Sequence, residues 1–83
     1  GGAKVMDMNK QAMINRFKIG QRVQVIQMTE KGDAKHYKQS KANGIIVGVY
    51  EHFVVVYNGR YRESFSWVDI AIGRVSIKAV KAA

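Results

Sequence analysis

Aromatic and arginine residues alternate with aliphatic ones between positions 50 and 62, and both types suit the recognition of nucleic acid. Aromatic rings stack on unpaired bases, and arginine adds phosphate contacts and planar stacking. If this stretch forms strands, side chains alternate between the two faces of a sheet, so one face collects both types. That face is expected to carry Tyr50, Phe53, Tyr57, Arg60 and Arg62.

A second basic cluster lies in residues 29–43, TEKGDAKHYKQSKAN, which have no clear strand or helix pattern. Positions 34 to 43 contain no acid, and lysines there alternate with a histidine and a tyrosine. Lysines neutralise phosphates and a tyrosine can stack on a base, so the stretch is predicted to be a nucleic-acid-binding loop. Its candidate residues are Lys31, Lys35, Tyr37, Lys38 and Lys41. The alternative interpretation is a solvated polar loop.

The groups available for acid–base or metal chemistry are His36, His52, Glu51 and Glu63. None pairs with another at a spacing that builds a catalytic site. Two histidines far apart, in a chain without cysteine, make a poor metal site. We therefore predict no catalytic residues, no metal and no cofactor.

The elements that position the aromatic face are three strands within residues 44–65, joined by two tight turns. Asn58-Gly59 is typical of a type I′ hairpin turn, in which both central residues need positive φ. With a two-residue loop there and another at Glu51-His52, the strands acquire two distinct faces. The predicted core face carries Ile45, Val47, Val49, Val54, Val56, Tyr61 and Phe65. Turning the other face inward would bury two arginines, each at a cost of several kcal/mol, so Ile46 and Val55 are expected on the outside.

Two further elements precede the hairpins. Asn9 is placed to cap a short helix over residues 10–16, with Ala12, Met13 and Phe17 on one side. Residues 21–28, QRVQVIQM, alternate polar and aliphatic side chains and predict the first strand.

After the hairpins, the alternation breaks at SWVDI, residues 66–70. Ser66 is expected to cap a single helical or 3₁₀ turn that Gly73 closes. Its apolar residues Trp67, Ile70 and Ile72 would plug one end of the core. Residues 74–78 alternate again and predict the last strand.

Length and composition limit the type of protein. The 83 residues suffice for one domain. Lys and Arg number 14 against 6 Asp and Glu, a net charge of +8 that favours a polyanionic partner. There is no cysteine and no apolar run long enough to span a bilayer or to serve as a signal peptide. These features predict a cytoplasmic protein without membrane association.

The segments FKIGQRVQV, NGIIVGVY, FVVVYNG and SWVDI together resemble an SH3-like barrel. The resemblance implies five strands, a long loop over residues 29–43 and a 3₁₀ turn over residues 66–70. SH3-like barrels serve as nucleic-acid modules, chromatin proteins, peptide readers and, rarely, enzymes, so the fold alone does not decide the function. The combination of GVYEHFVVV with YRESFSWVDI is also similar to small uncharacterised proteins of bacterial mobile elements and phages.

KIGQRV and IIVGVY are similar to segments of the plasmid-borne type II dihydrofolate reductases, which are tetrameric SH3-like barrels. Those enzymes carry a Val-Gln-Ile-Tyr run on a late strand. Here the corresponding region reads RESF, so that activity is not expected.

The sequence thus predicts an all-β chain: a helical or flexible arm over residues 1–16, a five-stranded SH3-like barrel over residues 17–78 and a tail over residues 79–83. The expected function is non-catalytic binding of DNA or RNA by a monomer or weak homodimer. The alternative is a protein-interaction module or homo-oligomer that uses the aromatic face, with an acidic protein as partner.

Overall fold

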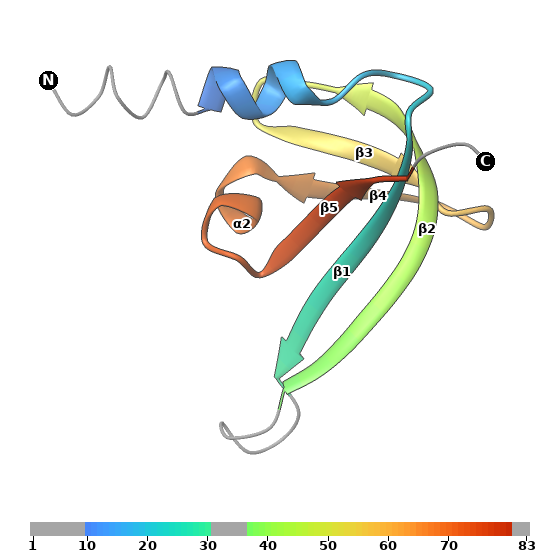
Figure 1. The fold of residues 1–83 in the computed structure, drawn as a ribbon, viewed down its shortest axis with the longest axis vertical. Helices are drawn as coiled ribbons and strands as arrows, with labels where there is room; N and C mark the ends of the chain where they lie inside the picture. Colours follow the sequence, from blue (N-terminus) through green and yellow to red (C-terminus); the bar gives the residue numbers. More distant parts are fainter. Residues whose placement is uncertain (1–9, 31–36, 81–83) are drawn as a thin grey trace, which may run out of the picture.

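Five strands form one antiparallel sheet in the computed structural model, which describes residues 10–30 and 37–80 (Figure 1). The strand order across the sheet is β4-β3-β2-β1-β5. The strands are β1 (Arg22–Glu30), β2 (Tyr37–Val49), β3 (Phe53–Tyr57), β4 (Arg62–Ser66) and β5 (Val75–Ala79). A short helix, α2 (Trp67–Ala71), connects β4 to β5, and residues 10–16 form a helix before β1. The prediction of a mainly β chain with five strands is confirmed.

The sheet is curved but is not a closed barrel, which corrects the prediction of closure. β4 and β5 are its two edges, and within the described ranges no ladder joins them. The 13-residue β2 bends along its length, so the sheet curls around its inner face (Figure 1). α2 connects the two edge strands and contacts both of them.

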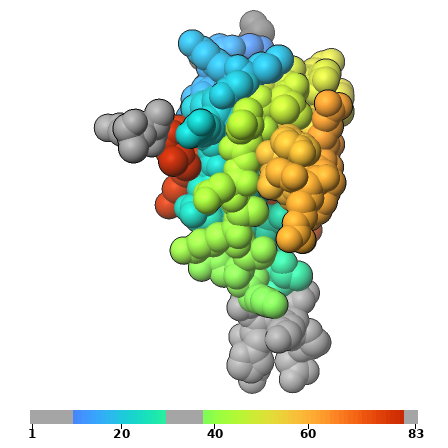
Figure 2. Space-filling view, turned by 90° about the vertical axis from the view of Figure 1, so that its right-hand side faces the viewer, coloured from blue at the N-terminus to red at the C-terminus, as the bar shows by residue number. Residues whose placement is uncertain are grey.

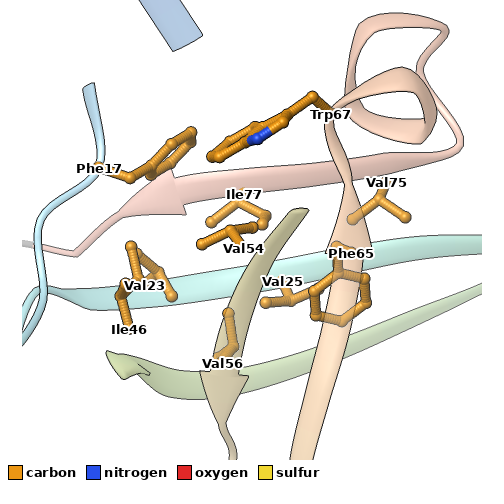
Figure 3. Packing of buried hydrophobic residues seen from close by; sticks show 10 residues of the cluster. All are labelled: Phe17, Val23, Val25, Ile46, Val54, Val56, Phe65, Trp67, Val75 and Ile77. Carbon is orange, nitrogen blue, oxygen red and sulfur yellow. The ribbon is translucent and has the colours of Figure 1, made fainter. Parts of the chain in front are cut away.

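The core lies on the inner face of this curved sheet (Figure 3). Every strand contributes at least one buried side chain, and α2 and the segment before β1 add an aromatic ring each. The buried hydrophobic residues are Phe17, Val23, Val25, Ile46, Val54, Val56, Phe65, Trp67, Val75 and Ile77. The predicted core positions Val54, Val56 and Phe65 are therefore confirmed.

An irregularity in β2 reverses the predicted orientation of its first half. Val49 lies opposite Val54 as expected, but the register shifts between Ile46 and Gly48. A bulge of this kind inserts one extra residue, here Val47, and so turns the preceding residues to the other face. Ile46 is consequently fully buried, whereas Ile45, predicted in the core, is 40% exposed.

The turn between β3 and β4 is a four-residue loop over residues 58–61, not the predicted two-residue turn. The side-chain oxygen Oδ1 of Asn58 accepts hydrogen bonds from the backbone N–H groups of Arg60 and Tyr61, at 3.0 and 3.1 Å. Only Gly59 of the loop has positive φ, so the turn is not type I′. Val56 lies opposite Glu63, two residues from the predicted partner, and a shift by two preserves the faces. Tyr61, predicted in the core, lies in the loop and is exposed.

The prediction of a long loop over residues 29–43 is wrong for residues 29–30 and 37–43, which belong to β1 and β2; residues 31–36 lie outside the described residues. β1 and β2 pair continuously from Arg22 opposite Ile45 to Glu30 opposite Tyr37. Backbone hydrogen bonds between antiparallel strands need no hydrophobic side chains, so the polar ends of β1 and β2 extend the hairpin as an arm (Figure 1).

Trp67 and Phe17 close one end of the core. Their rings stack with centroids 5.7 Å apart, and the indole Nε1 of Trp67 donates to the backbone oxygen of Tyr50 at 2.8 Å. Met13, Ile14 and Ile70 pack against this end of the core. The predicted plug is thus formed by Trp67 and Ile70, but Ile72 is exposed, because it follows the last turn of α2.

Candidate functional site

The outer face of the sheet carries a row of four exposed residues, one from each of four neighbouring strands. Arg22 lies opposite Ile45, Ile45 opposite Tyr57, and Tyr57 opposite Arg62. Directly opposite residues share a face and have neighbouring side chains. An aliphatic and an aromatic side chain are therefore flanked by two arginines. Figure 2 views the molecule with β2 in the middle, β1 on one side and the β3–β4 end on the other.

A second aromatic group lies at the β2–β3 turn. The ring centroids of Tyr50 and Phe53 are 5.0 Å apart, and both residues are exposed. The Tyr50 ring lies over Gly48, where a Cβ would collide with it. Phe53 and Tyr57 are four residues apart on β3, or about 13 Å at roughly 3.3 Å per residue. The three predicted aromatics therefore share one face but form two separate platforms.

An open groove of about 390 Å³ adjoins the row of four. Arg22, Ile45 and Tyr57 line it, together with Val80 and the start of the loop after β3. Val80 belongs to the same row, because its N–H donates to the backbone oxygen of Arg22 at 2.9 Å.

Two more basic residues share the outer face. Lys41 lies four residues before Ile45 in a stretch of β2 with regular pairing, so both point to the same side. Lys78 of β5 is opposite Gln24, two residues beyond Arg22 on β1. Arg22 and Lys78 were not among the predicted site residues. The alternation of Val23 and Val25 with their polar neighbours could have placed Arg22 on the outer face. No local sequence pattern predicts the β1–β5 pairing that places Lys78 there.

One strand carboxylate, that of Glu63, points away from this basic face. Among the strand side chains that the structure describes, the only carboxylate is that of Glu63, which lies opposite the buried Val56. Its Oε2 accepts a hydrogen bond from Nε2 of Gln27 at 3.2 Å. Glu63 is half-buried on the inner face, so it does not neutralise the outer arginines and lysines.

The remaining predicted site residues do not all lie on the outer face. Lys38 lies on β2 at a position that alternates to the face opposite Lys41, and Arg60 lies in the loop after β3. Tyr37 begins β2. Lys31 and Lys35 lie outside the described residues. The structure therefore unites the aromatic residues, Arg62 and Lys41 on one face, and leaves Lys38 on the other.

Two of the candidate acid–base residues, Glu51 and His52, are neighbours in the β2–β3 turn. His52 Nε2 and Glu51 Oε2 are 4.0 Å apart, but these side chains are 75% and 80% exposed, so solvent screens the pair. His36 lies outside the described residues. No group of three potential metal ligands occurs in residues 10–30 and 37–80. None of the helices described is long and apolar enough to cross a membrane.

No protein-family model matches this sequence, and no match was found among curated proteins or among solved structures.

Proposed function

We propose that the protein is a small non-catalytic module that binds nucleic acid on the outer face of its sheet. The observation that carries the proposal is the row formed by Arg22, Ile45, Tyr57 and Arg62, which spans four strands. It combines two fixed positive charges with an exposed ring, and Lys41 and Lys78 extend the same face.

The two kinds of side chain have complementary roles in this proposal. The arginines and lysines neutralise phosphates and release the counterions that surround a nucleic acid. The rings of Tyr57, Tyr50 and Phe53 stack on bases, each worth about 1–3 kcal/mol. Because Glu63 faces inward, its carboxylate does not oppose the approach of a polyanion to the outer face.

We also propose that the chain is an SH3-like fold with an open edge. The consecutive β1–β4 meander, the return of β5 to β1 and the short helix between β4 and β5 support this assignment. SH3-like folds have many functions, so the functional proposal rests on the side chains of the face and not on the fold.

A titration of isotope-labelled protein with single-stranded DNA, RNA and duplex DNA tests the proposal. We expect saturable backbone amide shifts on Arg22, Ile45, Tyr57 and Arg62. The shifts should weaken steeply between about 50 mM and about 200 mM salt. The double variant Arg22→Ala/Arg62→Ala should bind about tenfold more weakly or worse, because two phosphate contacts are lost.

The matched control is Arg16→Ala/Lys18→Ala, which removes the same charge from two exposed residues outside the sheet. It should bind nearly as tightly as the parent protein. Equal losses in the two double variants would mean that binding follows net charge alone. Absence of saturable shifts with all three nucleic acids would refute the proposal and favour a protein partner for the aromatic face.

A further inference from the structure

The backbone of β5 presents hydrogen-bonding groups along an open edge of the sheet. Met28 N–H donates to the oxygen of Arg74 at 3.0 Å, and Val80 N–H donates to the oxygen of Arg22 at 2.9 Å. In an antiparallel ladder, alternate residues direct their backbone groups to opposite sides. The odd-numbered residues of β5 therefore direct their N–H and C=O groups away from β1: Val75, Ile77 and Ala79. Within the described residues, no protein group bonds to them.

A groove of about 500 Å³ runs along this edge. β5 forms one side, and the helix over residues 10–16 and α2 contribute the apolar side chains of Met13 and Ile70. Phe17, which stacks on Trp67, also lines it. An extended segment lying in the groove could add to the sheet by backbone pairing while its alternate side chains contact these apolar groups.

The positive charge of the groove favours a partner that carries acidic residues. Arg16 and Lys78 line it, and its lining contains no carboxylate. We propose that the groove binds an extended peptide segment of another protein that carries acidic residues beside alternating apolar ones. A nucleic acid has no amide backbone to continue the ladder, and a second copy of this chain would bring the same two cations against Arg16 and Lys78.

The edge lacks two of the usual features that prevent strand addition, a bulge and a proline. β5 pairs with β1 in unbroken register, without a bulge, and contains no proline. Natural edge strands are commonly blocked by such features or by covering elements. The helix over residues 10–16 and α2 flank the β5 edge and leave a groove between them, which is suited to a binding role.

The variant Ala79→Pro tests the proposal at a single backbone N–H. Ala79 is exposed, and its N–H points away from β1, so a proline there keeps the β1–β5 ladder. The control Ala79→Ser retains the N–H. The probe is a fluorescein-labelled peptide of alternating valine and threonine with glutamates at both ends, and its binding is followed by fluorescence anisotropy.

We expect Ala79→Pro to bind this peptide about tenfold more weakly than Ala79→Ser, since one backbone hydrogen bond is lost and the edge is blocked. A peptide with lysines in place of the glutamates should bind about tenfold more weakly to the parent protein. Equal peptide affinity in the two variants, with circular dichroism unchanged, would overturn the proposal.

Light scattering on the parent protein and on Ala79→Pro measures the oligomeric state and so tests whether a second copy of the chain pairs with this edge. If the parent protein is a dimer and Ala79→Pro is a monomer, the β5 edge is used for self-association and the peptide proposal is wrong. Because β5 carries only Lys78 of the outer-face cations, nucleic-acid affinity should be the same in Ala79→Pro and Ala79→Ser. Failure of the peptide proposal is therefore separate from failure of the nucleic-acid proposal.

Discussion

Trp67 connects three parts of the chain that are distant in sequence. Its ring stacks on Phe17, its indole N–H bonds to the Tyr50 carbonyl, and its backbone N–H donates to the oxygen of His52 at 3.2 Å. It is also the first residue of α2 and is 2% exposed. The segment before β1 and the β2–β3 turn are both held to α2 by this one side chain and its backbone.

Trp67→Phe is expected to lower the free energy of unfolding by about 1–3 kcal/mol. The phenyl ring can still stack on Phe17, but the Tyr50 carbonyl loses its donor in a part-buried position. Urea unfolding measures the effect, and Tyr61→Phe serves as control because Tyr61 is 58% exposed. The control should change stability by less than about 0.5 kcal/mol. A similarly small change in Trp67→Phe would show that the indole hydrogen bond contributes little to stability.

Local side-chain signals predicted the ends of α2 well but the β3–β4 turn incompletely. Ser66 Oγ accepts from the Asp69 N–H at 3.1 Å, and Gly73 adopts a φ of +84° after the helix, both as expected. Asn58 was recognised as a turn residue from its type. Its Oδ1 bonds to the two following N–H groups at Arg60 and Tyr61. The Asn-Gly pair predicts a turn but does not specify whether the loop has two or four residues.

At the scale of elements, β2 is where sequence patterns were least informative. Its first half is polar, so hydrophobic alternation could not identify it, and it is a strand because β1 pairs with it. Its second half, GIIVGV, is aliphatic throughout. Neither alternating set contains a polar side chain, so polarity does not choose the face, and the bulge near Val47 selects Ile46 for the core. The outer position of Ile45 beside Tyr57 follows from the same bulge.

The bulge predicts a large difference between two adjacent isoleucines. Ile46→Ala should destabilise the protein by about 2–5 kcal/mol, because it leaves a cavity at a fully buried position. Ile45→Ala removes the same atoms from a position that is 40% exposed and should cost less than about 1 kcal/mol. Urea unfolding midpoints with unchanged slopes give both values. The reverse order would mean that β2 pairs without a bulge and that Ile45 faces the core.

At the scale of the whole molecule, the proposed nucleic-acid site depends on the separation of charges by the sheet. Glu63 faces inward, whereas the basic strand residues Arg22 and Arg62 face outward. The sequence predicted the net charge and the aromatic face. It did not predict that the sheet would bring Arg22 and Lys78 to that face, because their placement requires the β1–β2 and β1–β5 pairings.

The salt dependence of binding measures how many of these charges act together. Four cations lie on the outer face of the strands: Arg22, Lys41, Arg62 and Lys78. If each neutralises one phosphate of a single strand, the logarithm of the association constant should fall against the logarithm of salt concentration with a slope of about −3. Fluorescence anisotropy with a labelled single-stranded oligonucleotide gives this slope.

The same experiment on the double variants separates a defined face from diffuse attraction. Arg22→Ala/Arg62→Ala should reduce the slope to about −1.5, because two of the four contacts are lost. Arg16→Ala/Lys18→Ala should leave it near −3, although the net charge falls equally. A slope that changes alike in both variants would distribute the contacts over the whole basic surface, and the row across β1 to β4 would then not be the binding site. A slope that responds only to Arg22 and Arg62 would assign the phosphate contacts to the face on which Tyr57 is exposed, so charge and stacking would act on the same strand of nucleic acid.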